Sequence, residues 1–162
     1  MKKILFIPVT VLIVMSLFSC ADPCETYTVE PFEATVTAES GEAVLTGKLK
    51  YASPTAISLT VSEPVNIKGL TFAVQDRSDY IMIGTMKSAS VPLSTFPYEN
   101  NVIENLFKAL QALQNGLNAP KNGTAKINCD YDYGKCMISF NSETQRVERI
   151  DAGKFKYTFL YD

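Results

Sequence analysis

The chain has 162 residues, no histidine, and a formal charge of −2 from 15 basic and 17 acidic side chains. The absence of His excludes Ser-His-Asp and Cys-His catalytic groups and the helical His-Glu-x-x-His zinc motif. Charges of both signs are interspersed, with no basic stripe that could neutralise phosphates, so we expect no nucleic acid partner.

The N-terminal segment has the pattern of an export signal. Lys2 and Lys3 supply a positive flank, and the run from Ile4 to Phe18 contains no charged residue. This run is shorter than the roughly 20 residues that a permanent membrane-spanning helix needs. It therefore indicates the apolar region of a signal peptide.

The end of the apolar run carries a recognisable motif. The sequence Leu17-Phe18-Ser19-Cys20 resembles the bacterial lipobox, with a bulkier residue than usual at Phe18. The resemblance implies that the Cys20 sulfur receives a covalent diacylglycerol lipid and that the peptide is cut just before Cys20. The mature protein would then be anchored in the cell membrane by this lipid, on the extracytoplasmic side.

An ordinary secretory signal, cleaved near Ala21 with Cys20 discarded, is the alternative. The thiol at the end of the apolar run favours the lipobox interpretation. We expect residues 1–19 to be a lipoprotein signal peptide and residues 20–31 to be a lipid-anchored tether. Residues 32–162 are then long enough for a single β-rich domain with one core.

Four cysteines occur in the chain. If Cys20 is acylated, three remain, so at most one intramolecular disulfide can form. Cys129 and Cys136 lie symmetrically about Asp132-Tyr133, and a hairpin turning there would place them opposite one another. We expect these two to form the disulfide and Cys24 to be free.

Most of the domain has the alternating pattern of half-buried strands. Apolar Ile57, Leu59 and Val61, for example, alternate with hydroxyl-bearing residues. Short polar or proline-containing breaks separate such segments, which is typical of an antiparallel meander. The expected strands are 32–39, 43–51, 57–61, 70–74, 80–86, 125–129, 136–140, 147–150 and 155–161.

The period changes once, over residues 101–114. There, apolar residues recur at helical spacing, with polar residues on the opposite side. Asn101 and Glu104 have the spacing of an N-terminal capping arrangement, and Asn115-Gly116 is a suitable stop. We expect an amphipathic helix that buries its apolar stripe against the sheet. The predicted fold class is mainly β (α+β): a curved antiparallel sheet, or half-barrel, with one amphipathic helix in its concave face.

The order of these elements resembles the lipoprotein-carrier half-barrel family (LolA/LolB-like). In that family a bent sheet wraps a helix-capped apolar cavity that holds acyl chains, so the resemblance implies lipid binding. It is a likeness of architecture, and no functional residue is carried over from it. The segments that carry it are Gly47-Lys48-Leu49-Lys50-Tyr51, Ser53-Pro54 before Ile57–Val61, Glu63-Pro64 before Gly69-Leu70, and the Pro92–Pro97 approach to the helix.

The search for catalytic or metal-binding groups gives little. Asp130-x-Asp132-x-Gly134 resembles the opening of a calcium loop but lacks a third ligand and a closing glutamate, so a solvated hairpin tip is the simpler interpretation. We expect no metal site, no cofactor beyond the covalent lipid, and no enzymatic activity.

Two functions remain. The first is a non-catalytic binding module for an apolar ligand, such as a lipid or acyl chain. The alternative is a structural or interaction lipoprotein of the cell envelope, with a filled core and a protein partner. The volume between helix and strands discriminates between them, because a carrier leaves a cavity where a scaffold packs closely. The expected lining residues are Leu49, Leu59, Val61, Leu106, Phe107, Leu110 and Leu113.

The lipobox interpretation predicts the outcome of one substitution. Cys20→Ala removes the sulfur that would carry the lipid, so the protein should no longer incorporate radiolabelled palmitate and should remain as precursor or be mislocalised. Labelling of the Cys20→Ala protein at the wild-type level would contradict the assignment.

Overall fold

The structure is a computed structural model that describes residues 24–41, 43–75, 78–82, 90–92, 102–131 and 134–162. The expected signal peptide, the lipobox with Cys20, and the expected helix cap at Asn101 lie outside these residues. In the part of the chain that is described, no helix is long and apolar enough to cross a membrane.

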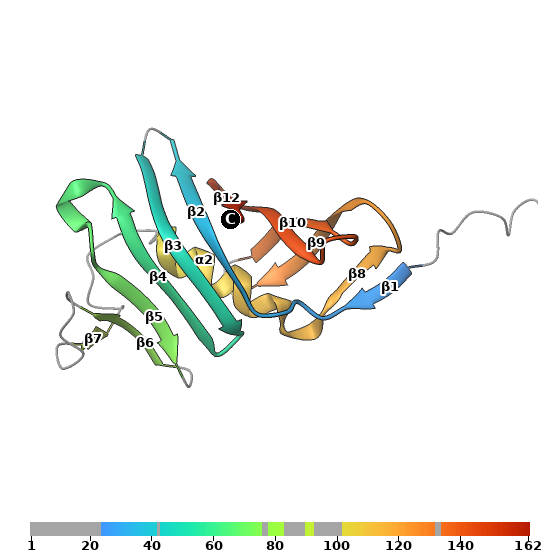
Figure 1. The fold of residues 1–162 in the computed structure, drawn as a ribbon, viewed down its shortest axis with the longest axis horizontal. Coiled ribbons are helices and arrows are strands. Elements are labelled where there is room, and N and C mark those ends of the chain that lie inside the picture. The colour runs from blue at the N-terminus through green and yellow to red at the C-terminus, as the bar shows by residue number, and fades with distance from the viewer. Residues whose placement is uncertain (1–23, 42, 76–77, 83–89, 93–101, 132–133) are drawn as a thin grey trace, which may run out of the picture.

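Within the described residues, ten strands form one antiparallel sheet (Figure 1), which confirms the predicted fold class. Their order across the sheet is β7-β6-β5-β4-β3-β2-β12-β11-β10-β9. The strands are β2 (Phe32–Ser40), β3 (Ala43–Ser53), β4 (Ala56–Glu63), β5 (Thr71–Gln75), β6 (Ser78–Met82), β7 (Ser90–Pro92), β9 (Thr124–Tyr131), β10 (Gly134–Asn141), β11 (Arg146–Ala152) and β12 (Phe155–Leu160).

The sheet consists of two meanders that meet at the β2–β12 pair. The first runs outward from β2 to β7, and the second runs inward from β9 to β12. Because β7 and β9 are the two outer strands, the chain must return across the sheet between them. The helix α2 (Val102–Gln111) and the 3₁₀ turn η3 (Ala112–Asn115) lie in this returning segment, and α2 crosses the sheet in Figure 1.

The alternation read from the sequence appears in the burial of the strands. In β4, Ile57, Leu59 and Val61 are buried, whereas Thr60 and Ser62 are exposed. The inward residues of β2 to β5, of β9 to β12 and of α2 belong to one hydrophobic cluster. The apolar sides of the strands therefore form the concave face, and the polar sides form the outer face.

Irregular pairing bends the sheet. The β3–β4 register shifts between Thr46 and Gly47, and the β10–β11 register shifts between Ser139 and Phe140. Such bulges increase local twist and curvature. A Cβ on Gly47 would lie 2.7 Å from the Thr60 carbonyl oxygen, so only glycine permits the close approach of β3 and β4 at this point.

The segment expected to be a tether is partly folded, which corrects the predicted domain boundary. Strand β1 (Cys24–Tyr27) pairs antiparallel with β8 (Leu117–Pro120), and Tyr27 and Val29 are buried in the core. Both strands have four residues, and β8 ends in proline, so neither shows a readable alternation. Among the described residues, the folded domain begins at Cys24, not at residue 32.

The β9–β10 hairpin has the register that the cysteine spacing predicts, because Cys129 and Cys136 are directly opposed. Cys136 is disulfide-bonded and buried. Its pairing with Cys129 remains a prediction that this register favours. Cys24 is a free, exposed thiol, as expected.

The remaining elements differ from the sequence expectation in their bounds. The expected helix runs as α2 and then tightens into η3, which ends at Asn115 beside the expected stop. Gly116 has φ +74° and lies against the Tyr27 carbonyl oxygen, a conformation that favours glycine. The 3₁₀ turn η1 (Val65–Ile67), between β4 and β5, and the strand β7 were not anticipated. Residues 83–86 of an expected strand lie outside the described residues.

Candidate functional site

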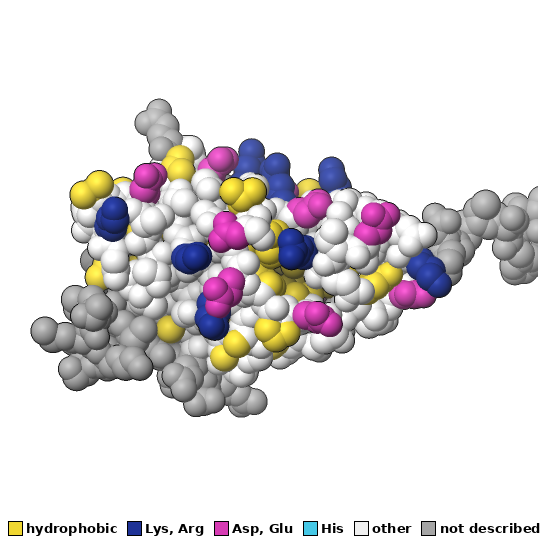
Figure 2. All heavy atoms as spheres, viewed as in Figure 1, with side chains coloured by type: hydrophobic (Ala, Val, Ile, Leu, Met, Phe, Trp, Pro, Cys, Tyr) yellow, Lys and Arg dark blue, Asp and Glu magenta, His cyan; other side chains and the backbone are white. Residues whose placement is uncertain are grey.

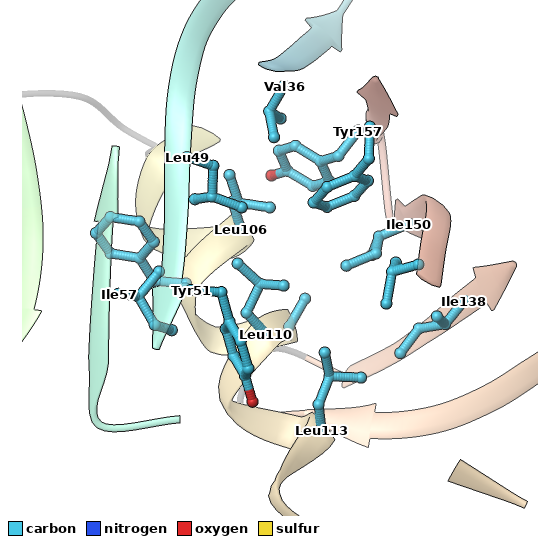
Figure 3. Packing of buried hydrophobic residues seen from close by; sticks show 14 of the residues in the cluster. Val36, Leu49, Tyr51, Ile57, Leu106, Leu110, Leu113, Ile138, Ile150 and Tyr157 are labelled. Carbon is cyan, nitrogen blue, oxygen red and sulfur yellow. The ribbon is translucent and has the colours of Figure 1, made fainter. Parts of the chain in front are cut away.

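The interior between α2 and the concave face is the place where an apolar ligand could be held. The helix packs against β9, β11 and β12 on one side. In Figure 3, Leu106 points toward Leu49 of β3, and Leu110 points toward Tyr51. On the other side of the helix, Ile138 and Ile150 complete the wall. The helix thus lies between two apolar walls, one from each meander.

The structure brings the seven predicted lining residues together, since all belong to one hydrophobic cluster. Leu49 and Leu59 oppose one another across the β3–β4 pair, and Leu59 also opposes Phe72 of β5. Each of the seven residues has a relative solvent-accessible surface of 2% or less. A side chain that borders a void large enough for water would have accessible surface facing that void. These seven side chains therefore pack without a water-sized space beside them.

Two tyrosines attach the helix to the second meander. The Tyr157 hydroxyl of β12 donates to the Val102 carbonyl at 2.7 Å. The Tyr131 hydroxyl of β9 donates to the Asn105 side-chain oxygen at 3.1 Å. Tyr157 and Asn105 are both buried. The bond from Tyr157 satisfies a buried hydroxyl, and the loss of such a partner typically costs about 1–3 kcal/mol.

Burial perturbs the tyrosines of the interior. It raises the pKa of Tyr157, with a smaller contribution from Tyr131 nearby, and it raises the pKa of Tyr51 to about 12. In both cases the low-polarity surroundings disfavour the phenolate. Both groups therefore stay neutral at physiological pH, where Tyr157 donates its hydrogen bond and Tyr51 packs in the core.

Sequence reasoning did not find the polar contacts of the helix. Asn105 lies within the apolar stripe of α2, between Ile103 and Leu106. A lone amide at such a position is a signal that a partner is required. The partner Tyr131 could not be identified, because it is distant in sequence and its contact depends on the tertiary fold.

The described residues contain no group of three or more His, Cys, Asp or Glu side chains that could hold a metal ion. Charges on the outer face pair locally. Arg149 and Asp151 form a two-pronged contact with distances of 2.7 and 3.0 Å, and Lys50 lies 2.8 Å from Glu33. Both pairs are accessible to solvent and contribute little to stability.

Comparison with known proteins gives only distant similarity. No protein family model matches the chain, and no curated protein matches it. A crystal structure of a LolA superfamily protein from Nitrosomonas europaea is similar, with a TM-score of 0.38 and 8% identity over 78% of this chain. The chain spans 66% of the length of that protein, just under two thirds.

A second similar structure is that of an uncharacterized conserved protein from Thermus thermophilus. Its TM-score is 0.41, with 9% identity over 81% of this chain and 76% of the other. One of the two structures thus bears the family name that the sequence pattern resembles. At this level of similarity the likeness carries no argument about function, which must come from the chain itself.

The raised pKa of Tyr51 predicts a loss of stability at alkaline pH. The unfolded tyrosine ionises near pH 10 and the folded one near pH 12, so the neutral folded form is favoured below pH 10 and this stabilisation is lost as pH rises through 12. Between pH 10 and 12, the free energy of unfolding measured in urea should fall by roughly 1–3 kcal/mol more in the wild-type protein than in Tyr51→Phe. Between pH 7 and 9 the difference between their free energies of unfolding should not change with pH. Parallel curves up to pH 12 would contradict the assignment.

Proposed function

We propose that this chain is a lipid-anchored lipoprotein of the bacterial cell envelope. Its core is filled by its own side chains, and it meets a protein partner through its outer surface. The proposal takes the anchor from the lipobox resemblance at Cys20 and the mode of action from the closed interior. Of the two functions that the sequence leaves open, this is the structural or interaction lipoprotein.

The observation that carries the proposal is the closure of the predicted cavity. A ligand pocket typically has a volume of about 300 Å³ or more, and its lining side chains keep exposed surface. The seven lining candidates retain 2% or less. A Cβ placed on Gly47 would come within 2.9 Å of the Leu59 side chain, so β3 and Leu59 are in close contact at this point.

Transient binding of an acyl chain is the second candidate. The observation that favours it is the position of α2 between two apolar walls (Figure 3). Displacement of the helix would uncover a continuous apolar surface from Leu49 to Ile150. Such a ligand would have to replace the contacts of Leu106 and Leu110, and the hydrogen bonds from Tyr157 and Tyr131 would have to break or move.

Replacing Leu59 by Phe separates the two candidates. In a filled core the larger ring overpacks, and we expect a loss of about 1–3 kcal/mol in the free energy of unfolding. Thr158→Phe is the matched control, because it adds a ring at an exposed position on the outer face of β12; it should leave stability nearly unchanged. Urea unfolding of the full chain in detergent measures the free energy of unfolding of both variants.

Native mass spectrometry of the same proteins, extracted from membranes, completes the test. The wild-type mass should equal that of residues 20–162 with the covalent lipid on Cys20. A non-covalent lipid on the wild-type protein that is lost from a fully stable Leu59→Phe variant would decide for the acyl-chain carrier.

A further inference from the structure

The distance between the proposed lipid anchor and the folded domain is short. Strand β1 begins at Cys24, and only residues 21–23 separate it from Cys20. Four residue steps of at most about 3.6 Å span about 14 Å, even when fully extended. The start of β1 must therefore stay within this distance of the lipid-bearing residue.

Strand β1 is itself fixed to the body of the domain. It pairs with β8 along its whole length, and the Thr26 hydroxyl donates to the Asn118 side chain at 2.6 Å. The Tyr27 ring packs against Phe140 with a centroid distance of 5.5 Å, and its hydroxyl donates to the Lys121 carbonyl at 3.2 Å. The β1–β8 ribbon cannot swing independently of the domain without losing these contacts.

The ribbon lies at one end of the molecule. In Figure 1, β1 and β8 occupy one end of the longest axis, and the β4–β5 connection, which contains η1, occupies the other. A restraint at β1 therefore acts on one extremity of an elongated domain. It keeps the ribbon close to the membrane, and when the ribbon end rests on the membrane the η1 end lies farthest from it.

We propose that the β1–β8 ribbon is a membrane-facing surface, which rests against the lipid headgroups and holds the domain end-on. This inference depends on the lipid attachment at Cys20 proposed above. The occupant is the headgroup layer and not a folded protein partner, because a separation of at most about 14 Å is smaller than the roughly 30 Å diameter of a small domain. A protein partner must bind elsewhere on the domain.

The chemistry of the ribbon suits a headgroup layer. Its side chains Glu25, Thr26, Asn118 and Lys121 are exposed and polar, and Glu25 lies 3.6 Å from Lys121 in an ion pair. Figure 2 shows acidic and basic side chains next to one another at this end. Polar groups of balanced charge can remain hydrated among headgroups, whereas burial in hydrocarbon would be costly. The contact is therefore superficial and is maintained by the anchor.

Energy transfer from two labelled positions tests this orientation. The lipid-modified full chain is placed in phosphatidylcholine vesicles that carry a headgroup-linked acceptor dye. A donor dye is attached either to the native Cys24 thiol, which is free and exposed, or to Val65→Cys in a Cys24→Ser background. Val65 is 85% exposed in η1. Non-reducing conditions preserve the disulfide of Cys136.

Transfer from Cys24 should be several-fold more efficient than transfer from position 65. The matched control inserts twelve Gly/Ser residues between Pro23 and Cys24, which gives a flexible linker of roughly 19 Å root-mean-square length. In that protein the difference in transfer efficiency between the labels at positions 24 and 65 should largely disappear. Equal transfer from both labels in the native-length chain, with the lipid on Cys20 verified by mass spectrometry, would overturn the orientation. Absence of the lipid from Cys20 would instead overturn the proposed attachment.

Discussion

The contact between the apolar stripe of α2 and the concave face of the sheet is the interaction on which the rest of the structure depends. The helix and the strands each present a large apolar surface, and each can be removed from water only by covering the other. Leu49 and Leu59 on the sheet and Leu106 and Leu110 on the helix are all fully buried. The curvature that bulges and Gly47 allow lets the strands of both meanders reach the same short helix.

The helix lies where the chain crosses from one edge of the sheet to the other. The two outer strands, β7 and β9, are separated in sequence by the helical segment, and in this crossing α2 packs against β9, β11 and β12. The hydrogen bonds from Tyr157 and Tyr131 then fix the helix to the second meander. The close packing of the lining candidates motivates the proposal that a protein partner binds the outer surface. With the proposed lipid on Cys20, the short distance from Cys20 to β1 would limit which parts of that surface such a partner reaches.

The strands and the helix were predictable because local patterns determine them. The alternation of Ile57, Leu59 and Val61 indicates a half-buried strand, and the 3.6-residue period indicates the helix. The ribbon of β1 and β8 was not predictable, since strands so short carry no periodic signal and pair across about 90 residues of chain. Closure of the interior was also beyond the sequence, because a cavity and a core use the same residue types. Only packing showed that the lining candidates meet without space.

Amide hydrogen exchange of the full chain tests most directly whether the helix is an integral part of the core. If α2 fills the interior, its amides should open with the same free energy as those of β3 and β12, because the helix can leave only when the domain unfolds. If α2 is a lid over a ligand site, the amides of Leu106 to Leu110 should exchange at least about 100-fold faster than those of the strands, through a local opening. Similar protection of helix and strands is the predicted result, and selective fast exchange of the helix would contradict the closed core.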